Sequence, residues 1–266
     1  MTKTAVVALA LVSSSFSLFA QQDTLRVPVR PSLSDTAYHR VDWNRPLVKT
    51  PFAFRKALAP AGLIVYGALA VRMDAFQDVN EGVKEEIWED NPHKLVHLDN
   101  YLQWSPAAAV YALNLAGIKG KNNFRDRTII FGMSEVIMSS VVFSVKKFTG
   151  EWRPNGSDAL SFPSGHTANA FAGAEFLRQE YKDVSPWIGV AGYVAAGATG
   201  FLRMYNNKHW LSDVAAGAGV GILSTDLAYY LYPRMKRWFS KKKDLSTFVM
   251  PTYQNGAVGF GLVHHF

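Results

Sequence analysis

The sequence predicts an all-α protein, a compact bundle of six helices followed by a short C-terminal β-hairpin. Two observations support this fold class. Of the 266 residues, 48% are hydrophobic and 18% are charged, which is too apolar for a disordered chain and fits one ordinary domain. Six apolar stretches rich in alanine and glycine recur with a spacing that favours helices over strands. They cover residues 57–72, 102–118, 127–148, 166–182, 186–203 and 211–232.

The N-terminal end, residues 1–20, is typical of a secretory signal peptide. Lys3 supplies the positive start, an apolar run follows, and Ala20 is a small residue before the expected cleavage point. Leu18, two residues before Ala20, is a poor residue for a signal-peptide cleavage site. An uncleaved membrane anchor is therefore the alternative. Either form directs the chain out of the cytoplasm. Residues 21–54, with four prolines and little apolar periodicity, predict an extended segment.

The apolar stretches leave two alternatives open, buried core helices or membrane helices. Most fall short of the ~20 apolar residues that span a bilayer comfortably. The longest nearly uncharged stretch, Thr128–Val145, carries Glu135 as its single charge. Small residues in Gly189–Gly200 and Ala215–Gly221 predict close approach of two core helices.

Between the first two stretches, the acidic segment Asp74–Asn100 predicts a solvated helix or loop. His93, His97 and Asp99 could be drawn as a metal site. We favour surface or capping roles for the two histidines, because no further ligand follows at helical spacing, and we expect no metal.

The C-terminal end changes character after Pro233, where a basic cluster runs from Arg234 to Lys243. Residues 247–253 and 257–265 then alternate in polarity around Asn255-Gly256, which predicts a β-hairpin packed on the helices.

The net charge and the absence of cysteine limit the classes of partner and site that the protein can have. The net charge of +7 suits nucleic acid, an anionic membrane surface or an anionic substrate. No segment resembles a nucleic-acid-binding module, so we expect a phosphate or lipid partner and no nucleic acid. The absence of cysteine excludes disulfides, zinc–thiolate sites and a lipoprotein anchor cysteine.

Three polar clusters lie at the ends of apolar stretches. Each one alone has an ordinary structural explanation, as a charge at a helix end, a helix cap, or a surface pair four residues apart. Together they supply what a phosphate group needs. They are Lys146 with Arg153-Pro154, then Pro163-Ser164-Gly165-His166, then Arg203 with His209 and Asp213.

Phosphate oxygens require positive charge and N–H donors. The planar guanidinium groups of Arg153 and Arg203 can each grip two oxygens, and Lys146 adds a point charge. Ser164 and Gly165 would present backbone N–H groups at a helix N-terminus, which binds anions. These five residues are therefore the predicted phosphate ligands.

The histidines supply the reactive steps. His209 is the predicted nucleophile, because the carboxylate of Asp213 one helical turn later can hold its tautomer. His166 is the predicted general acid, with Asp158 as a weaker candidate for tuning it. No metal or other cofactor is needed, because the cationic side chains already neutralise the phosphate.

In order and spacing the three clusters resemble the motifs of the type 2 phosphatidic acid phosphatase (PAP2) superfamily, which includes bacterial acid phosphatases and vanadium haloperoxidases. Leu202 departs from the serine that the family often has before the arginine of the third motif. The resemblance implies a PAP2-type helical bundle and the same roles for the phosphate ligands, His166, His209 and Asp213. The expected organisation is a signal peptide (1–20), an extended segment (21–54), a phosphatase domain (55–235), and a basic linker with a hairpin (236–266).

Three functions compete. The first is a phosphatase acting on a membrane lipid phosphate, such as a phosphatidate-like lipid, a polyprenyl diphosphate or lipid A. The second is a soluble periplasmic acid phosphatase of broad specificity. The third is a vanadium-dependent haloperoxidase, or a binding protein that has lost catalysis. We favour the lipid phosphatase.

The distribution of charge predicts a bacterial envelope protein with its site facing the periplasm. Basic residues flank the ends of the stretches opposite the motifs, and the positive-inside tendency places those ends in the cytoplasm. A cleaved signal conflicts with six spans, but fewer spans or an uncleaved N-terminus both keep the site periplasmic. Aromatic residues near stretch ends favour membrane association. They are Trp187, Trp210, Tyr229 and Tyr230.

Overall fold

The computed structural model describes residues 54–240, 247–254 and 257–264. The expected signal peptide and extended segment lie outside the described residues, apart from Phe54 at the last position of that segment. The division into domains stays a prediction.

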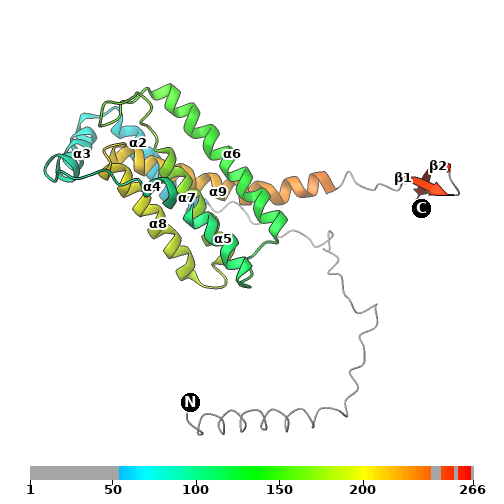
Figure 1. Ribbon diagram of the computed structural model, residues 1–266. Coiled ribbons are helices and arrows are strands. Elements are labelled where there is room, and N and C mark those ends of the chain that lie inside the picture. The colour runs from blue at the N-terminus through cyan, green and yellow to red at the C-terminus, as the bar shows by residue number, and fades with distance from the viewer. Residues whose placement is uncertain (1–53, 241–246, 255–256, 265–266) are drawn as a thin grey trace, which may run out of the picture. The chain divides into compact units, whose positions relative to one another are not determined.

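The described part of the chain from 54 to 240 is α-helical, which confirms the predicted fold class. The six predicted stretches correspond to α2, α4 with α5, α6, α7, α8 and α9 (Figure 1). The helices are α2 (Phe54–Ala70), α3 (Asp74–Lys84), a π-helical turn η1 (Glu85–Glu89), α4 (Asp99–Leu102), α5 (Ser105–Leu115), α6 (Phe124–Thr149), α7 (Gly165–Tyr181), α8 (Pro186–Tyr205) and α9 (Leu211–Ser240).

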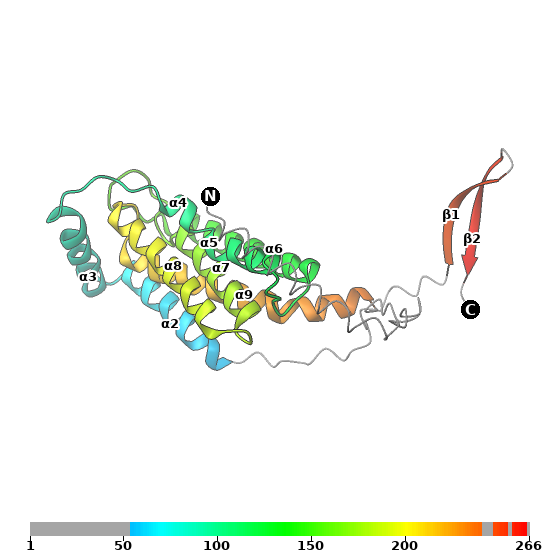
Figure 2. The same cartoon turned by 60° about the horizontal axis from the view of Figure 1, so that its bottom comes forward.

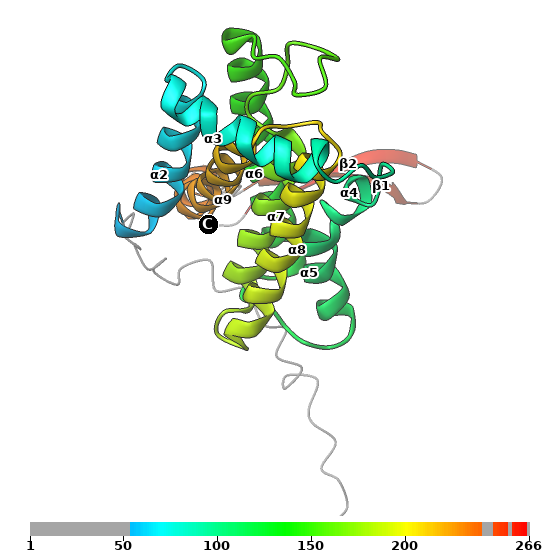
Figure 3. The same ribbon diagram turned by 90° about the vertical axis from the view of Figure 1, so that its left-hand side faces the viewer.

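Helix α7 occupies the centre of the bundle. It packs against α5, α6, α8 and α9, and Figure 3 shows it between its neighbours. Its small residues Ala168, Ala170, Ala172 and Ala174 are all fully buried. Because these four residues are small, neighbouring helices can pack closely on several sides of α7.

Small residues allow α9 to lie directly against α7. A side chain at Gly221 would overlap the carbonyl of Ala168 and lie 2.8 Å from the amide nitrogen of Ala172. On α8, a side chain at Gly192 would come within 2.9 Å of Leu177. The close helix approach predicted from the two small-residue runs is therefore confirmed.

Helix α9 continues beyond the apolar stretch that ended at residue 232. Pro233 lies inside the helix, and the basic segment expected to begin a linker at 236 is helical up to Ser240. A proline removes one helical hydrogen bond and crowds the preceding turn. Contacts to the start of α6 offset that cost, because Tyr232 and Lys236 both bind Asp126, at 2.5 and 2.8 Å.

The C-terminal residues form two antiparallel strands, β1 (Thr247–Gln254) and β2 (Ala257–His264), with Met250 opposite Gly261. The Asn255-Gly256 turn on which the predicted hairpin rested lies outside the described residues. The hairpin turn and its packing on the helices stay predictions.

Among the described residues, α6 and α9 (as far as Trp238) are long and apolar enough to cross a membrane. A third span would require α2 and the α3–η1 segment together, which meet at a bend of 95° (Figure 2). On α6, Val136 and Phe143 are about two-thirds exposed, at 67% and 66%. These features favour a membrane-associated protein.

Candidate active site

The predicted site residues come from five segments that meet at one end of the bundle. Lys146 lies near the end of α6, Arg153 lies in the following loop, and Ser164-Gly165-His166 begins α7. Arg203 lies near the end of α8, and His209 and Asp213 lie on either side of the start of α9. The contacts below join Lys146, Arg153, Ser164, His209 and Asp213, while Arg203 and His166 contact the first two residues of α4.

His209 and Asp213 form the buried centre of the site. Nδ1 of His209 lies 3.2 Å from Oδ2 of Asp213, and both residues are almost fully buried. The same carboxylate oxygen accepts hydrogen bonds from the Trp210 backbone N–H at 2.9 Å and from Ser161 Oγ at 2.5 Å. The carboxylate therefore favours the tautomer with the proton on Nδ1, which leaves the lone pair on Nε2.

His209 is held in its neutral form. Burial lowers its pKa well below the usual value, and the nearby charges of Arg203, Lys146 and Arg153 lower it further. A neutral imidazole with an unprotonated Nε2 has the protonation state that a nucleophile needs.

Arg153 faces the unprotonated Nε2 of His209. Its Nη1 lies 3.5 Å from His209 Nε2 and donates to the carbonyl of Lys208 at 3.3 Å. Its Nε donates to Asp158 Oδ1 at 2.8 Å, and this arginine lowers the pKa of Asp158. The expectation that Asp158 tunes His166 is therefore wrong. Asp158 orients Arg153, because the two lie in one loop and close a short ion pair.

Lys146 binds the loop that carries Arg153. Its ammonium group donates to the carbonyls of Leu160 and Ser161, at 2.5 and 3.0 Å. The Ser161 side chain reaches Asp213 and also lies 3.4 Å from His209 Nδ1. Ser161 is thus a site residue that the sequence analysis missed. An isolated loop serine carries no signal in the sequence that would have singled it out.

Ser164 caps the N-terminus of α7. Its side chain accepts from the Thr167 backbone N–H at 3.4 Å and from Thr167 Oγ1 at 2.9 Å. The Ser164 N–H donates to the Asp213 carbonyl at 3.0 Å, which joins the start of α7 to the start of α9. At Gly165 an added Cβ would meet nothing closer than a Val142 methyl group at 3.8 Å.

Arg203 and His166 both contact the first residues of α4. Arg203 Nη1 lies 2.5 Å from Asp99 Oδ2, and His166 Nε2 donates to Asn100 Oδ1 at 2.9 Å. Burial and the Arg203 charge lower the pKa of His166 to about 4. Neither Asp99 nor Asn100 was predicted as part of this site.

His93 contacts Tyr205 at the end of α8, whereas Asp99 contacts Arg203. His93 stacks on Tyr205 with ring centroids 3.6 Å apart, and its Nε2 donates to the Tyr205 carbonyl at 2.7 Å. Within the described part of the chain, no three His, Cys, Asp or Glu side chains gather as a metal site.

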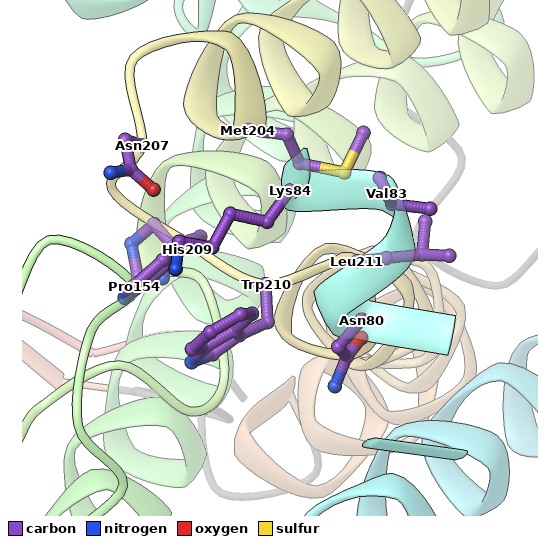
Figure 4. Close-up of a pocket in the computed structure, with 9 residues that line it drawn as sticks. All are labelled: Asn80, Val83, Lys84, Pro154, Met204, Asn207, His209, Trp210 and Leu211. Carbon is purple, nitrogen blue, oxygen red and sulfur yellow. The ribbon is translucent and has the colours of Figure 1, made fainter. Parts of the chain in front are cut away.

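A small pocket lies beside His209 (Figure 4). Helix α3 forms one wall and is anchored to the start of α9, because Asn80 exchanges hydrogen bonds with Ser212 at 2.9 and 3.0 Å. The Lys84 ammonium lies 5.7 Å from the centre of the Trp210 ring and 3.0 Å from Glu89. The lining residues are Asn80, Val83, Lys84, Pro154, Met204, Asn207, His209, Trp210 and Leu211.

Comparison with known proteins adds a family match. Residues 128–237 match the family model of the PAP2 superfamily. The chain is 41% identical over 135 residues to a lipid A 1-phosphatase of Porphyromonas gingivalis, a match that covers 50% of this chain. The chain spans only 30% of the length of that relative.

Two solved structures are similar at low identity. The crystal structure of Aquifex aeolicus LpxE is 22% identical, with a TM-score of 0.44, over 57% of this chain and 94% of that one. A transmembrane PAP2-type phosphatidylglycerolphosphate phosphatase from Bacillus subtilis is 20% identical, with a TM-score of 0.47, over 70% of this chain and 98% of that one.

Proposed function

We propose that this chain, whose residues 128–237 match the family model of the PAP2 superfamily, is a phosphatase acting on a membrane lipid phosphate. The bond broken is a phosphate ester or pyrophosphate bond, the intermediate is a phosphohistidine on His209, and the site faces the periplasm. The observation that carries the proposal is the buried His209–Asp213 pair, with Nε2 of the histidine facing Arg153 at 3.5 Å.

In the first step, His209 Nε2 attacks phosphorus. A P–N bond forms as the P–O bond to the leaving group breaks, and His166 gives the leaving oxygen a proton. Asp213 stabilises the positive charge that develops on the His209 ring. Arg153, Arg203 and Lys146 neutralise the nonbridging oxygens, and the Ser164 hydroxyl and the Gly165 N–H at the start of α7 donate hydrogen bonds to them.

In the second step, water replaces His209. His166 removes a proton from the water as its oxygen attacks phosphorus, and the P–N bond breaks. Inorganic phosphate leaves, and both histidines return to their starting forms. His166 thus alternates between acid and base, as one group must when the two half-reactions reverse the direction of proton transfer.

Two observations favour a lipid as the substrate. Helices α6 and α9 are long and apolar enough to cross a membrane, and the site lies at the end of one and the start of the other. The relative from Porphyromonas gingivalis is a lipid A 1-phosphatase. The soluble acid phosphatase remains the second candidate, because most of the other helices are too short to span a bilayer.

The periplasmic orientation rests on charge. The opposite ends of α6 and α9 carry the basic segments Lys119–Arg127 and Arg234–Arg237. Because basic flanks favour the cytoplasmic side, the motifs belong on the other side.

The experiment that tests the activity is a substrate panel with the purified full-length protein in detergent. Release of inorganic phosphate is measured from phosphatidate, undecaprenyl diphosphate, lipid A and p-nitrophenyl phosphate. We expect faster turnover of a lipid than of p-nitrophenyl phosphate, inhibition by vanadate, little effect of EDTA, and no turnover by His209→Ala. Equal or better turnover of p-nitrophenyl phosphate would favour the soluble acid phosphatase. Peroxide-dependent bromide oxidation by the vanadate-loaded protein, without phosphate release, would favour the haloperoxidase.

Orientation is tested by cysteine labelling, since the chain has no cysteine of its own. Ser157→Cys places a thiol in the exposed loop beside Arg153, and Lys121→Cys places one before the start of α6. A membrane-impermeant maleimide should label the first in cells with a permeabilised outer membrane and the second only after lysis. The reverse pattern would overturn the orientation.

A further inference from the structure

Two adjacent residues at the start of α4 each contact one predicted site residue. Asp99 contacts Arg203, and Asn100 contacts His166. Asp99 is 1% exposed, and its Oδ2 lies 2.5 Å from Arg203 Nη1. Asn100 Oδ1 accepts the Nε2–H of His166 at 2.9 Å. These partners are 104 and 66 residues distant in the sequence, so the contacts depend on how the chain folds.

The backbone before α4 is fixed in place by the end of α8. Val96 N–H donates to Asn206 Oδ1 at 2.8 Å, and Asn206 Nδ2 donates back to the Val96 carbonyl at 2.7 Å. After α4, Asn169 of α7 donates to Gln103 Oε1 at 3.2 Å. Asp99 and Asn100 are thus held from both sides.

In the Asp99–Arg203 ion pair, one polar atom of each side chain makes no hydrogen bond within the described residues. Asp99 Oδ1 and Arg203 Nε are buried and have no hydrogen-bond partner among the described residues. A buried ion pair with unsatisfied atoms is costly and contributes little net stability. One contact at Nη1 does, however, fix the guanidinium plane while leaving Nε free to donate to a phosphate oxygen.

Asp99 also supplies the negative charge that His166 requires. The positive groups that act on this ring are Arg203 of α8, Arg153 of the loop after α6, and Lys146 of α6. Together with burial they lower the pKa of His166, whereas Asp99 raises it. A general acid surrounded by cations can hold its proton only if a counter-charge lies nearby.

Asn100 selects the ring nitrogen of His166 that can react. Because the amide oxygen can only accept, His166 Nε2 must carry a proton. Nδ1 is then the nitrogen that gains and loses the second proton. A wrong tautomer would leave a lone pair at the wrong ring position.

We propose that Asp99 and Asn100 are positioning residues of the phosphatase reaction. Asp99 orients Arg203 and stabilises the imidazolium form of His166, and Asn100 fixes the ring nitrogens of His166. This inference rests on the proposed function, because it assigns both residues to the acid step.

The first experiment compares Asp99→Asn, Asp99→Glu and Asn100→Ala with Asp90→Asn, a control in the same segment. For Asp99→Asn we expect kcat to fall about tenfold to a hundredfold without a matching rise in KM, and the alkaline limb of the pH–rate profile, where the general acid His166 loses its proton, to move to lower pH. Asp99→Glu should restore part of kcat and return the alkaline limb towards the wild-type pH. Asn100→Ala should lower kcat about tenfold at unchanged KM, and Asp90→Asn should change neither.

A structural role would give a different result. An unchanged pH profile with a reduced amount of folded protein would overturn the role of Asp99. Because Asn100 is exposed, its alanine variant should fold normally. Wild-type kcat in that folded variant would overturn the role of Asn100.

The second experiment does not depend on turnover. Nitrogen-15 NMR of the histidine rings, with saturating inorganic phosphate, reports the protonation and tautomer of His166. Asp99→Asn should lower the pH at which this ring titrates, and Asn100→Ala should mix its tautomers. If these shifts occur but no lipid is hydrolysed, the proposed function fails, whereas the conclusion that Asp99 and Asn100 control the His166 ring still holds. If lipid is hydrolysed and the shifts are absent, the positioning fails alone.

Discussion

Ser161 Oγ lies 2.5 Å from Asp213 Oδ2, the same carboxylate oxygen that faces His209 Nδ1. A loop serine after α6 and a helical aspartate of α9 therefore orient one imidazole together. Lys146 binds the backbone carbonyl of this serine at 3.0 Å. The orientation of the nucleophile thus depends on three elements that are far apart in the sequence.

Asp213→Asn should lower kcat about 10³–10⁴-fold, the scale seen when a histidine loses its orienting carboxylate. The amide can present its NH2 group to Nδ1, which would move the ring proton to Nε2 and remove the attacking lone pair. Vanadate affinity should change little, because Arg153, Arg203 and Lys146 are untouched. Steady-state kinetics and vanadate inhibition measure the two effects. Near-normal kcat would reject the dyad.

Arg153→Lys should weaken phosphate and vanadate inhibition more than Asp158→Asn does. Lysine keeps the charge but loses the planar fork that binds two oxygens, so we expect a loss of about tenfold or more. The Asp158 side chain is 43% exposed, and its ion pair with Arg153 should contribute about 1 kcal/mol or less, equivalent to a change of about fivefold at most. Arg125→Lys, at the opposite end of α6, is the control. Equal effects of the Arg153 and Asp158 variants would show that orientation outweighs direct binding.

Phosphate binding should take up a proton near neutral pH. The pKa of His166 is lowered to about 4, so the ring is neutral at pH 7 in the free protein. A bound dianion favours the imidazolium form and raises that pKa, so phosphate affinity should increase as the pH falls towards the free-state value. Calorimetry in buffers of different ionisation enthalpy measures the uptake. His166→Gln should abolish it, and uptake that persists would assign the proton to another group.

Gly221→Ala should destabilise the bundle, whereas Gly197→Ala should not. A methyl group at 221 meets the backbone of α7, and such overpacking costs about 3 kcal/mol. That corresponds to a fall in Tm of about 6–12 °C. Position 197 is exposed, with nothing within 4 Å of an added Cβ, and alanine should favour the helix by about 0.5–1 kcal/mol. Thermal unfolding in detergent compares the two, and equal Tm values would contradict the close contact of α7 and α9.

The sequence predicted the parts of the protein that depend on local patterns. Apolar periodicity located all six main helices, and motif spacing singled out Arg153, His166 and His209. Asp99, Asn100 and Ser161 were missed, because their partners lie 48 to 104 residues away and no periodic signal links them. Helix α9 passed through Pro233 because distant Asp126 binds its last turns, and a local rule on proline cannot include such a contact.

The position of the site at one end of both α6 and α9 has a consequence for how substrate arrives. If these two helices cross the bilayer, Lys146 and Asp213 lie near the level of the lipid headgroups. A lipid could then deliver its phosphate by lateral diffusion while its acyl chains stay in the leaflet. Turnover would depend on the mole fraction of substrate in the membrane, and diluting the vesicles in buffer would leave it unchanged.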